Sequence, residues 1–186
     1  MALLPILEFP DPRLRTVATP VDAAWLAEPA TQKLIDDMFE TMKEYQGVGL
    51  AAPQVHESLR IFVAGFAPSP DDDDEDEDDD RRVPLMALIN PEITPTSTDV
   101  VEDWEGCLSI PDIRGRVPRA RQITVQAYDR KGKRIEVRAS GFTARVIQHE
   151  TDHLDGVLFF DRMKSFESLT FLDEYTRYWS RGRNVP

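Results

Sequence analysis

Two histidines four residues apart, with a glutamate directly after the first, constrain this chain more than any other feature. The segment His149-Glu150-Thr151-Asp152-His153 places both imidazoles one turn apart on the same helix face. Both can then reach one metal ion, and the Glu150 carboxylate can act as a general base without being a ligand. The chain has only 3 histidines, so a chance pair on a surface helix is the weaker interpretation. The sequence therefore predicts a metal-binding helix.

The third ligand is less well determined by the sequence. A catalytic site of the zinc type uses three protein ligands and one water, and Cys107 is the obvious candidate because Gly106 lets the backbone turn tightly before it. The alternative is that Cys107 is a small buried hydrophobic residue, as most free cysteines are. Asp152 is a competing ligand, or equally a structural residue. A thiolate with two imidazoles can hold iron(II), zinc, nickel or cobalt.

Charge is concentrated in one tract. The net charge is -12, but residues 71–80 are an unbroken acidic run, and without it 24 acidic residues stand against 22 basic ones. Such blocks repel themselves and are usually disordered. We therefore expect an acidic loop inserted at 68–82 into one domain covering 1–186. The alternative is that the tract itself binds basic partners. The nearly neutral remainder predicts no specific nucleic-acid binding.

Periodicity and turn residues predict helices and strands in mixed order, which favours an α+β fold. One helix is expected at 31–46, with Thr31 as N-cap and Gly47 as stop, and another at 141–154, followed by Gly156. Strands are expected at 59–64, 85–89 and 157–160, a hairpin at 121–139 with its turn at 130–133, and a last helix at 166–181. His56 is expected to be an exposed loop residue without a role.

Cysteine usage and the first residues bear on the compartment. A single cysteine cannot form an intramolecular disulfide, which suits a reducing environment. The start of the chain lacks a basic region and meets Pro5 and Glu8 early, which does not fit a signal peptide. Apolar stretches fall short of the roughly 18 residues that span a bilayer. We therefore expect a cytoplasmic protein without membrane association.

Three segments, taken together and in order, resemble the peptide deformylase family. They are Gly47-Val48-Gly49-Leu50-Ala51-Ala52-Pro53-Gln54, then Glu105-Gly106-Cys107-Leu108-Ser109, then Gln148-His149-Glu150-Thr151-Asp152-His153 with Leu154-Asp155-Gly156 after it. Each of the first two is weak alone, but all three in the family's order are specific. The similarity runs from about Ile6 to Asp161. The acidic run is not part of the family's pattern.

The resemblance implies a fold, an activity and a set of roles. The fold is a central metal-binding helix packed against partly wrapped antiparallel or mixed sheets, with a C-terminal helix. The activity is hydrolytic removal of the formyl group from formyl-methionyl nascent polypeptides, which releases formate. One divalent metal ion per chain, naturally Fe(2+) with Zn, Ni or Co as replacements, is implied on Cys107, His149 and His153. Glu150 is implied as the general acid and base, and Gln54 with the Leu108 N–H as oxyanion donors. The implied substrate-binding residues are Gly47, Val48, Gly49, Glu105, Gly106, Arg114 and Val146.

Competing functions remain at this point. A metalloendopeptidase shares the H-E-x-x-H pattern, although such sites commonly use a further histidine or carboxylate, and no histidine follows His153. A binding module without catalysis would not need Glu150. The resemblance also implies work near the ribosome, for which Arg177, Arg181 and Arg183 are weak support because surface solvation explains them equally well.

Overall fold

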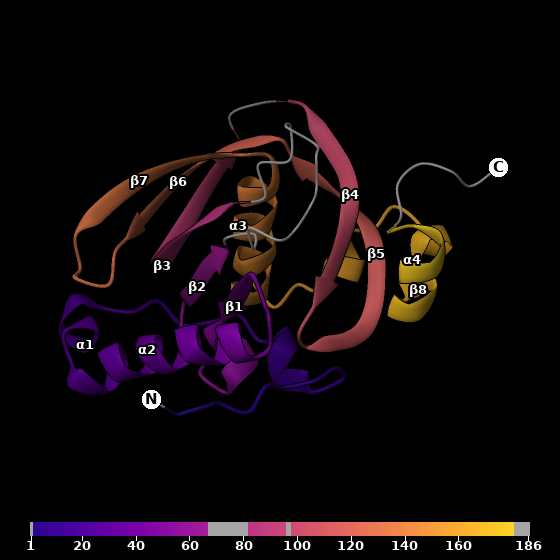
Figure 1. The fold of residues 1–186 in the computed structure, drawn as a ribbon. Helices are drawn as coiled ribbons and strands as arrows, with labels where there is room; N and C mark the ends of the chain where they lie inside the picture. Colours follow the sequence, from indigo (N-terminus) through magenta and orange to yellow (C-terminus); the bar gives the residue numbers. More distant parts are fainter. Residues whose placement is uncertain (1, 67–81, 96–97, 181–186) are drawn as a thin grey trace.

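Two antiparallel sheets surround one helix in the computed structural model, which describes residues 2–66, 82–95 and 98–180 (Figure 1). A sheet with the order β1-β2-β3-β6-β7 is formed by Gly49–Ala51, Ile61–Phe66, Val83–Pro95, Gln122–Tyr128 and Arg134–Ser140. A second sheet with the order β4-β5-β8 is formed by Val100–Cys107, Ile110–Ala120 and Thr170–Phe171. The expected α+β class is confirmed. The predicted acidic loop at 68–82 lies outside the described residues except for Arg82.

Helices cover both faces of the five-stranded sheet. On β2, Phe62 and Ala64 pack in one apolar cluster with α3 (Gly141–Leu154), whereas Ile61 and Val63 pack in another with α2 (Pro29–Glu44). Alternate residues of a strand point to opposite faces, so the two helices are held on opposite sides. The metal-motif helix is thus sandwiched, and Figure 1 shows it standing between the two sheets.

The second sheet contributes a long hairpin that the sequence analysis did not predict. β4 and β5 pair from Val100↔Ala120 to Cys107↔Ile110, with a register shift between Gly106 and Cys107. Many positions on these strands are polar, and the segment contains two prolines, so apolar alternation does not identify it. Cys107 stands at the end of β4 and packs in a third apolar cluster with Val117 and Phe159.

Helix boundaries follow the capping residues. The helix expected from Thr31 begins at Pro29, which suits a first helical position. Thr31 is instead buried, and its hydroxyl donates to the Trp25 carbonyl at 2.7 Å. At the other end Gln46, with φ of 53°, takes the left-handed conformation, and the Gly47 N–H donates to the Met42 carbonyl at 2.8 Å. The second helix matches its expected range of 141–154.

Two expectations near the C-terminus are wrong. Residues 157–160 do not form a strand, because the chain turns at Gly156 with φ of 70° and then enters a 3-10 helix, Phe159–Arg162 (η3). The start of η3 is fixed by the Asp161 carboxylate, which accepts from the Leu158 N–H. The last helix is also shorter than 166–181. A 3-10 turn, Phe166–Ser168 (η4), and strand β8 precede α4 (Leu172–Tyr178), since Thr170 and Phe171 pair with β5. Residue 181 lies outside the described residues.

The N-terminal segment holds three parts of the fold together, and it includes a 3-10 turn, Pro12–Arg15 (η1). The Leu7 N–H donates to the Gln54 carbonyl at 2.7 Å, in the 3-10 turn Ala52–Val55 (η2). The Phe9 N–H donates to the Ser109 carbonyl, and the Ala18 N–H to the Leu154 carbonyl, both at 2.8 Å. The short helix α1 (Ala23–Leu26) follows. His56 is exposed in its turn, as expected.

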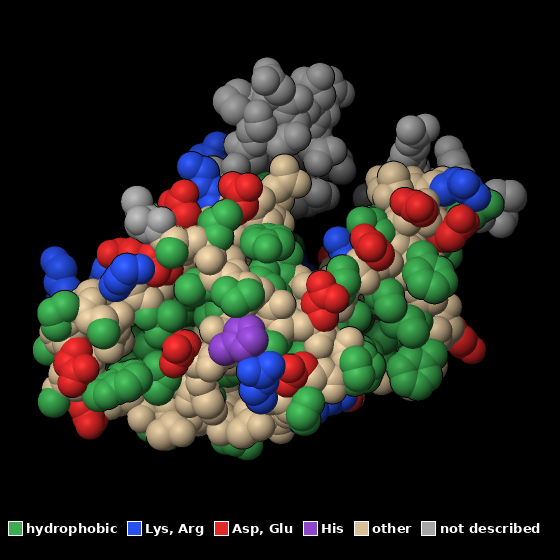
Figure 2. All heavy atoms as spheres, turned by 90° about the horizontal axis from the view of Figure 1, so that it is seen from below, with side chains coloured by type: hydrophobic (Ala, Val, Ile, Leu, Met, Phe, Trp, Pro, Cys, Tyr) green, Lys and Arg blue, Asp and Glu red, His purple; other side chains and the backbone are tan. Residues whose placement is uncertain are grey.

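Apolar side chains gather over the C-terminal elements, on the side of the molecule away from β7 (Figure 2). Trp104 of β4 contacts Tyr175 of α4, with ring centroids 4.9 Å apart, and Trp179 beyond it at 5.6 Å. These contacts attach α4 to the hairpin.

Every helix in the described part of the chain is too short or too polar to cross a bilayer.

Candidate metal centre

The end of strand β4 and the helix α3 bring the three expected ligands together. Ligand atoms of Cys107, His149 and His153 all lie within 4.8 Å of one another, and all three side chains are buried. The Cys107 Sγ is 3.2 Å from His153 Nε2. The helix supplies both imidazoles from one face, and Cys107 supplies the sulfur from the end of β4, where the register shifts after Gly106. The structure therefore brings the three residues together as one candidate metal site.

A carboxylate fixes the orientation of one imidazole. His149 Nδ1 lies 2.9 Å from a carboxylate oxygen of Glu105, an arrangement in which this nitrogen donates and Nε2 is left free to bind a metal. Glu105 is itself buried, and its carboxylate also accepts from Arg119 at 2.9 and 3.0 Å and from Arg145 at 2.8 Å. Burial opposes ionisation, but Arg119 and His149 hold the pKa of Glu105 well below its usual range. Carboxylate–histidine pairs of this kind are typical of metal sites.

The neighbouring imidazoles favour the thiolate form of Cys107. Burial alone would raise the pKa of Cys107, but the imidazoles of His153 and His149 outweigh this effect and lower the pKa to about 5. The thiolate is the form that binds metals. One thiolate and two imidazoles, gathered in a buried site with one imidazole held by a carboxylate, fit a divalent transition metal.

Glu150 lies beside the ligands without belonging to them. Its side chain is buried, and in the described part of the chain its Oε2 has no hydrogen-bond partner. Burial raises the pKa of Glu150 to about 7, against the lowering influence of His149 and His153. A carboxylate with a pKa near neutrality and an unused oxygen suits a group that accepts and returns a proton.

A methyl group at position 49 is expected to displace this carboxylate. A Cβ built on Gly49 would lie 2.2 Å from Glu150 Oε1, so in Gly49→Ala the flexible glutamate must move. Misplacement by about 1 Å can cost about a hundredfold in rate. We expect kcat for a hydrolysis that uses Glu150 to fall by about that factor while the bound metal, measured by elemental analysis, is unchanged. Loss of metal in this variant would show that Gly49 supports the ligands instead.

An open cleft of about 660 Å³ leads to the site. Of the sequence-predicted residues, only His153 is absent from its lining. The remaining predicted residues in the lining are Gly47, Val48, Gly49, Gln54, Glu105, Gly106, Cys107, Leu108, Arg114, Val146, His149 and Glu150. Sequence reasoning missed Trp104 and Leu172, which also line the cleft. The contact between β4 and α4 that brings them there depends on tertiary packing, which no local pattern predicts. The role of Glu105 is clearer than predicted, since its carboxylate is engaged by His149 and two arginines.

Gln54 is locked in place from both ends of its amide. Its Oε1 accepts from the Ala51 N–H at 2.8 Å, and its Nε2 donates to Ser109 Oγ at 3.1 Å and lies 3.6 Å from Cys107 Sγ. Gln54 as a whole is 2% exposed. The donor side therefore faces the ligand cluster, where a developing negative charge could be met.

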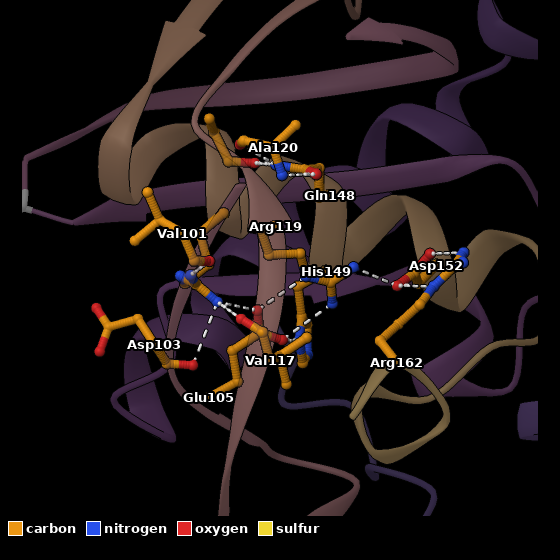
Figure 3. Close-up of polar contacts among 12 residues, drawn as sticks. Val101, Asp103, Glu105, Val117, Arg119, Ala120, Gln148, His149, Asp152 and Arg162 are labelled. Carbon is orange, nitrogen blue, oxygen red and sulfur yellow. Dashed lines mark hydrogen bonds and ion pairs between the residues drawn. The ribbon is translucent and has the colours of Figure 1, made fainter. Parts of the chain in front are cut away.

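Asp152 has a structural role. Its carboxylate accepts from Arg119 at 2.5 Å and from Arg162 at 2.7 Å, and it is not part of the ligand group (Figure 3). Of the two roles that the sequence left open, the structural one is supported. Arg119 and Arg145 were not singled out from the sequence. Position 145 did carry a signal, because it lies one turn before His149 on the same helix face.

Comparisons with known proteins agree with this geometry. Residues 3–168 match the sequence profile of the polypeptide deformylase family. A "peptide deformylase 2" of Xanthomonas campestris pv. campestris is 52% identical over 161 residues, 87% of each chain. One of Pseudomonas putida is 46% identical over 171 residues, 90% of this chain and 92% of the relative. A structure of a class I type b peptide deformylase from Acinetobacter baumannii with Met-Ala-Ser bound superimposes with a TM-score of 0.78 at 36% identity, covering 87% of this chain and 99% of that one.

Proposed function

The chain belongs to the polypeptide deformylase family, and from this premise we infer which residues perform the reaction. The protein is a hydrolase that removes the N-terminal formyl group from new polypeptides and depends on a metal. We propose Cys107, His149 and His153 as the metal ligands and Glu150 as the catalytic acid and base. The observation that carries the proposal is the buried Glu150 carboxylate, with one oxygen unused, next to the ligand cluster.

Iron(II) is the natural metal in this proposal, with zinc, nickel or cobalt as replacements. The mixed set of one soft thiolate and two borderline imidazoles accepts all four. When bound, the metal supplies Lewis-acid activation for hydrolysis of the formyl amide. Elemental analysis of protein prepared without oxygen would test the assignment, because a thiolate site is sensitive to oxidation.

Glu150 moves the proton in this scheme. It accepts a proton from the water that attacks the formyl carbon, and it then gives that proton to the nitrogen of the leaving methionine. The pKa of about 7 allows both halves of the exchange near neutral pH. Formate and a free amino terminus are the products, so one water is consumed for each formyl group.

The formyl oxygen becomes negative as water adds, and two donors of this chain are placed to receive it. We propose the Gln54 Nε2 and the Leu108 N–H, since both residues line the cleft beside Cys107. Gln54 is preorganised by its bonds to Ala51 and Ser109, so little reorganisation is needed during the reaction.

Replacing Gln54 by alanine is expected to lower kcat by about a hundredfold, equivalent to about 3 kcal/mol, because one oxyanion donor is lost. KM for a formyl-methionyl peptide should change much less, since the donor acts mainly in the transition state. Steady-state kinetics with Gln54→Ala, and with Gln54→Glu as a shape-matched variant without the donor, would measure this. Full activity of both variants would exclude the role.

Substrate binding is proposed to use the edge formed by Gly47, Val48 and Gly49. A peptide added there as a strand gains backbone hydrogen bonds that do not depend on its sequence. We propose that the methionine side chain lies against Val146 and near Arg114, whose cross-strand partner Gly106 also lines the cleft, as does Glu105. The Met-Ala-Ser bound to the Acinetobacter baumannii relative supports a peptide as the ligand. Limited room at the metal favours formyl over larger acyl groups, and equal activity on acetyl-methionyl peptides would refute this.

The nature of the substrate indicates where in the cell the reaction takes place. Formylated chains occur where proteins are being made, and we propose that this enzyme acts in the cytoplasm on nascent chains close to the ribosome. Sedimentation of the protein with ribosomes, with and without a formylated nascent chain, would test that part separately.

The defining experiment measures formate release from a short formyl-methionyl peptide under oxygen-free conditions. An unformylated copy and a longer peptide with internal bonds are the controls, and metal is determined on the same sample. Formate release without internal cleavage is the expected result. Internal cleavage without formate would instead favour a metalloendopeptidase, and an inactive protein with a filled metal site would favour a binding module.

A further inference from the structure

The proposed ligands are divided between two parts of the fold. His149 and His153 lie on α3, whose apolar residues Ala144 and Ile147 pack against the five-stranded sheet. Cys107 lies on β4 of the other sheet and belongs to a separate apolar cluster. Apolar packing within each cluster therefore does not by itself set the distance from the sulfur to the imidazoles. Whatever joins α3 to the hairpin must do so.

The Phe159 ring stacks on His149, and polar contacts also join the two parts. Arg145 makes more of these polar contacts than its neighbours. Its guanidinium donates to the Val101 carbonyl at 2.7 Å, to the Val117 carbonyl at 2.8 Å and to the Asp103 carbonyl at 3.3 Å. Figure 3 labels these three partner residues. The guanidinium also donates to the Glu105 carboxylate at 2.8 Å. These contacts reach the backbone of both strands of the hairpin, because Val101 and Asp103 lie on β4 and Val117 lies on β5.

Other polar links lie nearby but do not reach β4 in the same way. Gln148 bonds both backbone groups of Ala120, at the far end of β5 from Cys107. Arg119 holds the Glu105 side chain and Asp152. Arg145 alone among these three side chains binds backbone atoms of β4, and it does so from a position one helical turn before His149.

We propose that Arg145 is a positioning residue for the metal centre, which holds the β4 backbone against α3 so that the Cys107 sulfur stays in reach of both histidines. The Arg145 guanidinium holds the hairpin by donating to backbone carbonyls of β4 and β5. It also donates to the Glu105 carboxylate, which in turn restrains the His149 ring. Arg145 is 6% exposed, and a lysine, a point charge on a flexible stem, cannot reproduce the planar fork. This inference rests on the proposed ligand set.

Cobalt(II) provides a direct readout, because a cobalt–thiolate bond has its own near-ultraviolet absorption. The wild-type protein, Arg145→Lys and Arg145→Met would be loaded with cobalt, and release to a chelator would be followed well below each protein's unfolding temperature. Outer-shell changes typically cost 10–100-fold in metal affinity. We expect release from Arg145→Met to be about 10–100 times faster than from wild type, with a weaker thiolate band, and Arg145→Lys to fall between.

Arg60→Met is the matched control. Arg60 precedes β2 and donates to the Leu154 carbonyl at 3.3 Å and to Asp155 at 2.7 Å, so it also holds the end of α3, through partners that do not belong to β4. It should lose stability without a comparable change in cobalt release or in the thiolate band. Equal acceleration in Arg60→Met would show that any loosening of the helix has this effect, and would overturn the proposal.

Further outcomes separate the two levels of inference. If Arg145→Met does not fold, Arg145→Lys decides, and release at the wild-type rate with an unchanged spectrum overturns the proposal. If wild-type protein shows no thiolate band, or Cys107→Ser retains it, then the ligand set is wrong and Arg145 has nothing to position. A normal wild-type band with unaltered Arg145 variants refutes the positioning role alone.

Discussion

Replacing Glu150 by glutamine is expected to lower kcat for formate release by about 10²–10⁴-fold, which is the usual contribution of a positioned acid and base. The amide keeps the size of the side chain in its buried site but can no longer accept the proton from water. Metal content should remain at the wild-type level, because Glu150 is not part of the ligand cluster. Steady-state kinetics and elemental analysis on the same preparation would measure both quantities.

An exposed glutamate provides the control for this substitution. Glu57→Gln removes the same charge from the turn after η2, at an exposed position, and should leave kcat within about twofold of wild type, as surface changes usually do. Turnover by Glu150→Gln at the wild-type rate would remove Glu150 from the mechanism. Loss of its metal would show that the carboxylate supports the ligands, and the kinetic result would then no longer measure proton transfer.

Replacing Cys107 by alanine is expected to weaken metal binding by more than the 10–100-fold that outer-shell changes cost, because a direct ligand is removed. Formate release should fall in proportion to the metal lost. Excess metal should restore little activity, because two imidazoles alone bind a divalent ion weakly. They also no longer select against other divalent metals. Competition with a chelator of known affinity would give the dissociation constants.

The companion variant Cys107→Ser separates ligation from packing. Serine keeps nearly the same volume in the cluster with Val117 and Phe159 but lacks the thiolate. If both variants keep the wild-type metal affinity, Cys107 is a buried apolar residue, as the alternative interpretation of the sequence held. Thermal unfolding of each variant without metal would show whether the cluster itself has been disturbed.

The parts of the site that the sequence predicted are those with local patterns. His149 and His153 share a helix, so their four-residue spacing fixes their relation directly. Gln54 and Cys107 came from short motifs whose meaning depended on resemblance to a family. Arg145 shows the opposite case, because its partners are backbone carbonyls of Val101, Asp103 and Val117, which no sequence pattern marks.

Fold prediction failed where tertiary contacts override local preference. The apolar run 157–160 has the composition of a strand, yet Gly156 turns the chain and Phe159 is buried beside the metal helix, with its ring stacked at 6.5 Å from that of His149. The β4–β5 hairpin was missed because its strands alternate weakly and one of them contains Pro111 and Pro118. Helix α3 was predicted well, since its apolar period and its stop residue agree with its burial.

The bonds of the N-terminal segment have a consequence for how the molecule is made. Leu7, Phe9 and Ala18 are synthesised before their partners at Gln54, Ser109 and Leu154, which are spread along the chain that follows them. Contacts this distant in sequence require large loops to close, and topologies rich in them fold slowly. The metal pocket is therefore expected to form late, together with the whole domain. A chain shortened to end before α3 would lack both histidines, and it would also lack Leu154, the hydrogen-bond partner of Ala18.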